Sequence, residues 1–381
     1  MLLDHHQRVV ALVCVLSTAC AAGADRSRPT AAPRQLETLI AATMQERQIP
    51  GAAVAVLKDG RPLLLKGFGV ASQETRTPVS VDTIFQIAST TKPFTAMAVM
   101  MLVEEGKLEL DAPVRRYLEW VPEVYAGVTL RQLLHHTSGV ARDLRRENVD
   151  EFDVAEFRRR LASATPSFSP GARWEYSNTG YALLSFVVEE VSGRPFGEFL
   201  RARIFAPLGM RSTGYRVAQK NDSLHAVGYD LANGEPQRAP HVFSGFGNSG
   251  IETSLRDLVR WAKAVEQRKL LRPQTYDLLF GPGKLASGET AKFDFGGASS
   301  TYGLGWFLSS YEGETLVTHG GAIAGFSSIV NVFPRQGWTI IVLSNGKQGS
   351  DRRGQADAIA RAIANRVGIR NKAGAVPSAG Q

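Results

Sequence analysis

A serine and a lysine separated by two residues form the first pattern that could carry out chemistry. The segment Ser89-Thr90-Thr91-Lys92 has the spacing S-x-x-K, and Pro93 follows it directly. Since a helix tolerates proline only in its first turn, Pro93 predicts that a helix begins within a few residues of Ser89. Residues three positions apart lie on the same side of a helix, so Lys92 would face Ser89.

This arrangement would suit nucleophilic catalysis by the serine. A serine hydroxyl becomes an effective nucleophile when a nearby base takes its proton. A lysine in a water-poor interior loses affinity for its proton through desolvation and could be that base. The helix N-terminus would favour negative charge on the serine oxygen. The alternative, a serine that caps a helix beside an exposed lysine, fits the motif alone equally well.

The S-x-x-K spacing is not rare, and the chain contains a second copy at Ser344-Asn345-Gly346-Lys347. There the Asn-Gly pair is a turn signal at the end of a predicted strand. Ser344 and Lys347 would therefore not share a helix face. The physical context of the two copies favours Ser89 as the nucleophile.

Tyr176-Ser177-Asn178 is the second candidate segment. A tyrosine beside a buried cation can have its pKa lowered enough to relay a proton. An asparagine two residues later can form hydrogen bonds with a substrate amide or carbonyl. The alternative is an ordinary turn before a helix that starts near Gly180.

The third segment, His319-Gly320-Gly321, follows an apolar stretch that is typical of a strand. Two glycines at the end of a strand would let a substrate approach the backbone and its N–H groups. The alternative is a glycine turn with an incidental histidine.

The elements that must position these segments follow from the apolar periodicity. Helical spacing over 34–47 is followed by a hairpin pattern, 52–57 and 62–70, with Asp-Gly at its turn. Helical patterns dominate from 89 to 280. Strand patterns return at 303–309, 315–319, 327–333 and 338–344, and an amphipathic helix is expected at 356–367.

Strands at both ends of the chain and helices between them predict an α/β (α+β) fold. In this fold an antiparallel sheet, formed from both chain ends, is flanked by helices. A mostly helical region is inserted between the two parts of the sheet. Within a domain at 34–371, the sheet part would comprise about 34–88 and 300–370 and the helical part about 89–299. Sites in such folds tend to lie in the cleft between the two parts.

In this order and spacing, the three motifs resemble those of the serine β-lactamase and penicillin-binding protein superfamily, specifically its class C branch. That branch has the signatures S-x-x-K, Y-x-N and K-T-G or H-x-G. It includes class C β-lactamases, D-alanyl-D-alanine carboxypeptidases, D-amino-acid peptidases and family VIII carboxylesterases. The resemblance runs from about residue 36 to 366 and includes the accessory stretches 82–85, 106–111, 133–139, 207–210 and 302–306.

The resemblance implies a β-lactamase/transpeptidase-like fold and a role for each motif residue. Ser89 would attack the substrate carbonyl, and Lys92 and Tyr176 would share the work of general base and proton relay. Asn178 would contact the acyl side chain. The remaining implied residues are the substrate-binding His319, Gly320 and Gly321, and an oxyanion hole formed by the backbone N–H groups of Ser89 and Ala322. No metal and no organic cofactor is implied.

The third motif departs from that of class C β-lactamases, which have lysine, a hydroxyl residue and glycine there. His319 is largely neutral at pH 7, unlike lysine, and Gly320 lacks a hydroxyl donor for a substrate carboxylate. We therefore expect a serine hydrolase that acts on esters or on amide or peptide bonds of small acyl substrates. The alternative is a β-lactamase or D-alanyl-D-alanine carboxypeptidase, and a minor one is a non-catalytic binding or sensor protein of the same fold.

Other function classes fit the sequence less well. The net charge is +8, but the arginine clusters lie among acidic residues, so no nucleic-acid partner is expected. The G-x-S-x-G nucleophile elbow of α/β-hydrolases and the H-E-x-x-H spacing of metallohydrolases are both missing from the sequence. The adjacent His135 and His136 are expected to form structural hydrogen bonds, because neighbouring loop side chains usually point apart.

The first 24 residues are typical of a signal peptide, with an apolar run over 9–18 and the sequence Ala-Gly-Ala at 22–24. A linker would follow at 25–33, and a disordered tail is expected at 372–381. Both cysteines, Cys14 and Cys20, lie in the signal segment. We expect export to the periplasm or medium of a bacterium without stable membrane insertion; the alternative is a lipid anchor at Cys20.

Overall fold

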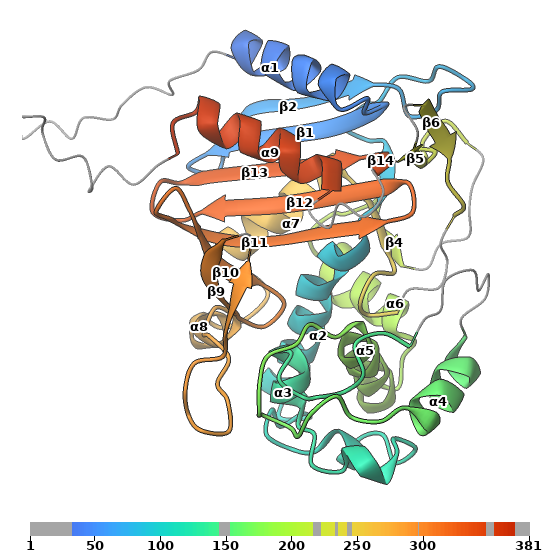
Figure 1. Ribbon diagram of the computed structural model, residues 1–381, viewed down its shortest axis with the longest axis vertical. Coiled ribbons are helices and arrows are strands. Elements are labelled where there is room, and N and C mark those ends of the chain that lie inside the picture. The colour runs from blue at the N-terminus through green and yellow to red at the C-terminus, as the bar shows by residue number, and fades with distance from the viewer. Residues whose placement is uncertain are drawn as a thin grey trace, which may run out of the picture.

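The large antiparallel sheet is built from the two ends of the chain (Figure 1). The computed structural model describes residues 33–144, 153–215, 222–232, 235–241, 246–295, 297–347 and 354–369. The predicted signal peptide at 1–24 and tail at 372–381 lie outside these residues, as does the linker at 25–33 except for its last residue. The sheet has eight strands in the order β2-β1-β13-β12-β11-β10-β9-β8.

An early hairpin pairs with the last long strand of the sheet. In the antiparallel register between β1 and β13, Ala55 lies opposite Ile341. The Asp-Gly pair forms the predicted turn of the hairpin, because Asp59 and Gly60 have left-handed φ angles of 49° and 70°. The bounds of the sheet strands are β1 Gly51–Lys58, β2 Arg61–Gly69, β8 Lys292–Phe295, β9 Ala298–Tyr302, β10 Phe307–Tyr311, β11 Glu314–Ile323, β12 Phe326–Phe333 and β13 Trp338–Ser344.

Both faces of the sheet are covered. Alternate residues of β1 point to opposite sides, as the strand period requires. Val54 belongs to an apolar cluster with Leu36 of α1 (Pro33–Glu46) and Ile359 of α9 (Gly354–Arg366), while Ala55 belongs to the larger cluster on the other side. The expected α/β fold, with its sheet made from both chain ends, is confirmed.

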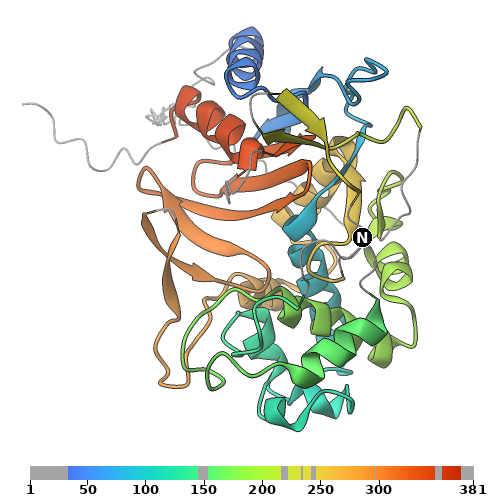
Figure 2. The ribbon, with the colours of Figure 1, turned by 45° about the vertical axis from the view of Figure 1, so that its right-hand side comes forward.

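The helical region packs against the opposite face of the sheet, where Figure 2 shows its teal and green helices gathered below the strands. Its central helix α2 (Lys92–Glu104) is buried from Lys92 to Leu102 and is apolar on all sides, which is typical of a helix inside a core. The other helices are α3 Leu130–Leu134, α4 Val154–Ser163, α5 Asn178–Ser192, α6 Phe196–Leu200, α7 Leu255–Glu266 and α8 Pro273–Leu279.

The structure differs from the sequence prediction in three places. The stretch predicted to be mostly helical contains β4 (Gly214–Tyr215), β5 (Tyr229–Ala232), β6 (Glu235–Arg238) and β7 (Ile251–Ser254). These strands complete two small sheets with β3 (Ile84–Gln86) and β14 (Gly346–Lys347). The strand predicted at 303–309 is interrupted by a turn, in which Gly305 has φ of 83°. The strand predicted to end at 319 continues to Ile323.

Candidate active site

Ser89 lies in a short 3₁₀ helix, Ala88–Thr91, that leads directly into α2. Pro93 is in the first turn of α2, as the sequence predicted. Ala88 has φ of 47°, a left-handed conformation that is costly for a residue with a Cβ atom and is typical of functional turns. Ser89 is partly exposed, whereas Ala88 and Thr90 on either side are buried. Ser89 is therefore more accessible to solvent than the residues on either side of it.

Lys92 is fully buried beside Ser89. Its Nζ lies 3.2 Å from Ser89 Oγ, 2.8 Å from Asn178 Oδ1 and 3.1 Å from the carbonyl oxygen of Asn248. Burial lowers the pKa of Lys92 well below its ordinary value, and the carboxylate of Asp143 opposes part of that shift. The buried position that the sequence predicted is therefore present, and it favours the neutral amine.

Tyr176 lies against the same amine, with Lys92 Nζ 4.6 Å from the centre of its ring. Burial raises the pKa of Tyr176, although its hydrogen bond with Ser89 acts in the opposite direction. The sequence-based expectation of a lowered pKa is thus wrong for this arrangement, because desolvation outweighs the hydrogen bond. Tyr176 keeps its proton at neutral pH and reaches the hydroxyl of Ser89 as a phenol.

Asn178 is the first residue of α5 and connects Lys92 with an acidic side chain. Its amide oxygen accepts from Lys92 Nζ, and its amide nitrogen donates to Asp143 Oδ2 at 2.8 Å. Ser177 caps the helix by accepting a hydrogen bond from the backbone N–H of Gly180 at 3.0 Å. The helix therefore begins two residues before the predicted position, and the cap fixes the direction of Asn178.

His319 lies within β11, and its side chain has no exposed surface. The hydroxyl of Tyr302 donates to His319 Nε2 at 2.9 Å, and His319 Nδ1 donates to the carbonyl oxygen of Gly320 at 2.8 Å. Burial lowers the pKa of His319 to about 3, so the ring is neutral. Both ring nitrogens have protein partners, and a direct contact with substrate would require the ring to leave them. That contact stays a prediction.

The glycines after His319 continue the strand instead of forming a turn. A Cβ atom on Gly321 would lie 2.2 Å from the carbonyl oxygen of Ile87 and 2.7 Å from the backbone nitrogen of Ser89. The hydroxyl of Ser328 donates to the same Ile87 carbonyl at 2.7 Å. Gly321 therefore allows β11 to pack directly against the turn that carries Ser89, which differs from the open approach expected for both glycines.

Ala322, the next residue of β11, is partly exposed and pairs with Ser327 of β12. Its position one residue beyond Gly321 brings this part of the strand close to Ser89. The assignment of an oxyanion hole to the backbone N–H groups of Ser89 and Ala322 stays a prediction.

Three residues near Ser89 and its neighbours were not predicted from the sequence. Asn248 contributes a backbone oxygen, which no side-chain pattern could predict, and Asp143 carries the charge that acts on Lys92. Tyr302 holds His319 from a different strand. The stretch 302–306 is one of the accessory matches to the family, so the sequence contains a signal for Tyr302 but not for its contact with His319.

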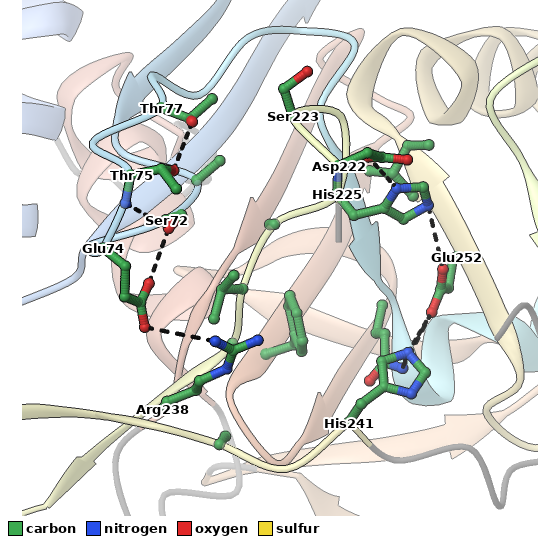
Figure 3. Close-up of a pocket in the computed structure, with 18 of the residues that line it drawn as sticks. Ser72, Glu74, Thr75, Thr77, Asp222, Ser223, His225, Arg238, His241 and Glu252 are labelled. Atoms are coloured by element: carbon green, nitrogen blue, oxygen red, sulfur yellow. Dashed lines mark hydrogen bonds and ion pairs between the residues drawn. The ribbon is translucent and has the colours of Figure 1, made fainter. Parts of the chain in front are cut away.

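A cavity of about 360 Å³ lies elsewhere in the molecule (Figure 3). At one side the carboxylate of Glu252 lies 3.0 Å from His241 Nε2 and 3.9 Å from His225 Nε2, and His225 Nδ1 donates to Asp222 at 2.7 Å. At the other side are Glu74 and Arg238. The described residues that line this cavity include none of the predicted site residues, although Gln86 precedes Ser89 by three positions.

Within the described part of the chain, no helix is long and apolar enough to cross a membrane.

Comparison with known proteins identifies the family. The family model Beta-lactamase matches residues 36–364. "Protein flp" from Staphylococcus aureus (strain MW2) is 29% identical over 326 residues, which are 82% of this chain and 63% of flp. "Penicillin-binding protein 4*" from Bacillus subtilis (strain 168) is 30% identical over 342 residues, which are 84% of this chain and 73% of that protein. The chain thus spans less than two thirds of the length of flp.

Solved structures give the same assignment. The octameric penicillin-binding protein homologue from Pyrococcus abyssi aligns with a TM-score of 0.75 at 30% identity, covering 88% of this chain and 78% of its own. The penicillin-binding protein from Bacillus halodurans aligns with a TM-score of 0.73 at 28% identity, covering 87% of this chain and 98% of its own. The chain belongs to the beta-lactamase family, in the superfamily of serine hydrolases that also contains the penicillin-binding proteins.

Proposed function

We propose that this chain is a serine hydrolase of the class C branch that forms an acyl-enzyme at Ser89. The observation that carries the proposal is the contact of 3.2 Å between Ser89 Oγ and the buried nitrogen of Lys92, whose pKa is lowered by desolvation. A neutral amine at this distance is suited to take the proton of the attacking hydroxyl.

The proposed reaction has two steps. Ser89 Oγ attacks the substrate carbonyl carbon, its proton passes through Lys92 and Tyr176 to the leaving group, and the carbonyl–leaving-group bond breaks. A water molecule then attacks the acyl carbon, the bond between that carbon and Ser89 Oγ breaks to release the acid, and a proton of the water passes to Ser89 Oγ. The backbone N–H groups of Ser89 and Ala322 would stabilise the oxyanion in both steps, and Asn178 would contact the acyl side chain.

We propose esters, or amide and peptide bonds of small acyl compounds including D-amino-acid peptides, as substrates. His319 supports this choice, because a buried neutral imidazole bonded to Tyr302 provides no cation for a substrate carboxylate. The family model Beta-lactamase and the relatives named as penicillin-binding proteins support a second candidate, a β-lactamase or D-alanyl-D-alanine carboxypeptidase. We further propose that the mature protein is exported.

The test compares turnover of a short-chain aryl ester, a cephalosporin and a D-alanyl-D-alanine peptide by wild type and by Ser89→Ala. We expect the ester to be turned over fastest and Ser89→Ala to be inactive. Ser344→Ala, which removes the serine of the other S-x-x-K copy, is the matched control and should keep wild-type rates. Cephalosporin turnover that exceeds ester turnover by orders of magnitude would favour the second candidate. Ester turnover that survives in Ser89→Ala would overturn the mechanism.

A covalent serine probe separates these enzymatic functions from the non-catalytic alternative. We expect the folded wild type to be labelled at Ser89 and Ser89→Ala to remain unlabelled. Folded wild type that is not labelled would favour a binding or sensor protein.

A further inference from the structure

His136 is a buried titratable residue that the proposed reaction does not use, and it lies directly behind Tyr176. Its side chain has no exposed surface. The centre of its ring is 4.4 Å from that of Tyr176, 4.5 Å from that of Tyr302 and 5.0 Å from that of Tyr181. The imidazole is therefore enclosed by three phenol rings, one of which belongs to the proposed proton relay.

The same residue holds the backbone on both sides of Tyr176. The N–H of Glu175 donates to the carbonyl oxygen of His136 at 2.9 Å, and the N–H of Ser177 donates to His136 Nδ1 at 3.1 Å. These are the amides immediately before and after Tyr176 in sequence. One residue thus fixes the backbone that carries Tyr176 and also packs against its ring.

The hydrogen bond from Ser177 also determines the tautomer of His136. Because Nδ1 accepts, the hydrogen of the neutral ring must be on Nε2. Nε2 has no hydrogen-bond partner among the residues that the structure describes. A buried N–H without a partner costs free energy, and His136 also has an unfavourable φ of 60°. Two such costs at one residue beside a reactive group indicate a functional constraint rather than packing alone.

Protonation of His136 would destroy this arrangement, since a protonated Nδ1 can no longer accept from Ser177. Burial lowers the pKa of His136 well below its ordinary value. The ring therefore remains a neutral acceptor over the pH range in which the proposed reaction would operate.

We propose that His136 is the positioning residue of Tyr176: it holds the amides of Glu175 and Ser177 and one face of the Tyr176 ring, so that the phenol stays in reach of Ser89. This inference rests on the proposed function, because it assigns His136 a role only through Tyr176. The structural hydrogen bond expected of this histidine is present, and the proposal adds a role in positioning Tyr176. His135 differs, since its Nδ1 donates to the carbonyl oxygen of Tyr302 at 2.9 Å.

A double-mutant cycle tests the proposal, using wild type, His136→Gly, Tyr176→Phe and the double variant. Glycine tolerates φ of 60°, so His136→Gly removes the ring without backbone strain. We expect His136→Gly to lower kcat about tenfold or more, with KM changed less, because a small displacement of a reacting group is costly. When Tyr176 is already replaced by Phe, His136→Gly should lower kcat less than about twofold. Equal losses in both backgrounds would overturn the proposal.

Two further variants separate positioning from a loss of folding. Asparagine tolerates a left-handed backbone and offers an acceptor near the position of Nδ1, so His136→Asn should restore much of the rate. His135→Asn is the matched neighbour and should leave kcat within about threefold of wild type, since its role is local to Tyr302. Thermal unfolding of every variant is measured in parallel, and only folded variants enter the cycle. An inactive His136→Asn that is folded would contradict the role of the Nδ1 acceptor.

A spectroscopic titration keeps the inference testable if the proposed function fails. The ionisation of Tyr176 is followed by ultraviolet difference absorbance, with Tyr176→Phe as the reference. We expect His136→Gly to lower the pKa of Tyr176 toward its ordinary value, because loss of the ring admits water to the phenol. An unchanged Tyr176 titration would overturn the positioning role even in a protein without turnover. Absence of labelling at Ser89 would instead overturn the proposed function alone.

Discussion

Lys92 Nζ lies 3.2 Å from Ser89 Oγ, and the lysine side chain has no contact with solvent. The two residues are joined by one turn of chain at the start of a buried helix, so their contact depends little on the rest of the fold. What the rest of the fold adds is the removal of water from the amine. Desolvation turns an ordinary neighbour of a serine into a candidate base.

Replacing Lys92 with methionine should remove this base. We expect kcat for the best ester to fall by roughly 10²- to 10⁴-fold, the usual contribution of a positioned acid or base. Lys347→Met changes the lysine of the second S-x-x-K copy and is the matched control. Steady-state kinetics on both folded variants measure the effect. A Lys92→Met enzyme that keeps more than about a tenth of the wild-type rate would contradict the assignment.

The pH dependence of kcat/KM should respond to Asp143. The proposed reaction needs neutral Lys92, so activity should rise as the pH rises through the pKa of Lys92. The charge of Asp143 raises that pKa. Asp143→Asn removes the charge and should therefore shift the acid limb of the profile to lower pH. Asp294→Asn, on strand β8, serves as a control for the loss of one negative charge. A shift to higher pH would contradict the assignment of the limb to Lys92.

The two glycines of the third motif should differ in their tolerance of a methyl group. In Gly321→Ala the new Cβ atom would meet the backbone of Ile87 and Ser89, which cannot move without displacing the Ser89 side chain. We expect a loss of about 1–3 kcal/mol in the free energy of unfolding and a large drop in kcat. In Gly320→Ala the closest atom is a terminal methyl group of Ile329 at 2.9 Å, which can rotate away.

Chemical denaturation and kinetics of both glycine variants provide the measurement. We expect Gly320→Ala to lose less stability and to keep most of its activity. Equal effects of the two substitutions would show that the contact of Gly321 with the nucleophile turn does not determine the site.

Acid should destabilise the fold through its buried histidines. Burial lowers the pKa of His135 to about 4 and that of His319 to about 3, from an ordinary value of 6.5. Between the lowered value and 6.5 the unfolded chain binds more protons than the folded chain. The stability that each neutral ring contributes is thus complete above pH 6.5 and is lost as the pH falls toward the lowered value.

Urea unfolding between pH 7 and pH 4 tests this expectation. Each histidine should contribute a slope of at most about 1.4 kcal/mol per pH unit. His319→Gln cannot take up a proton but can still accept from Tyr302, so its stability should vary less with pH. A slope that is the same in wild type and in His319→Gln would exclude His319 as a source of acid lability.

The sequence was sufficient where neighbours along the chain determine the outcome. Pro93 placed the start of a helix, and the S-x-x-K spacing then placed Lys92 beside Ser89. Alternating and helical apolar patterns predicted the sheet from both chain ends and its flanking helices. The short strands β3 to β7 were missed, because segments of two to four residues contain too few positions to show a period.

The tertiary structure decided which way the third motif faces. Sequence placed His319 and its glycines at the end of a strand, open to a substrate. In the fold, β11 pairs with β12 so that the side chain of His319 points into a buried layer beside Tyr302. The same pairing brings Gly321 against the turn that contains Ser89. Strand direction and register depend on pairing partners that lie elsewhere in the chain.

The contact between Ser89 and Lys92 was therefore determined by the sequence, because residues three apart at a helix start meet regardless of what surrounds them. The protonation of Lys92, Tyr176 and His319 was decided by the tertiary structure alone. Burial and the charges of distant residues such as Asp143 set those pKa values, and neither can be read from the spacing of residues along the chain.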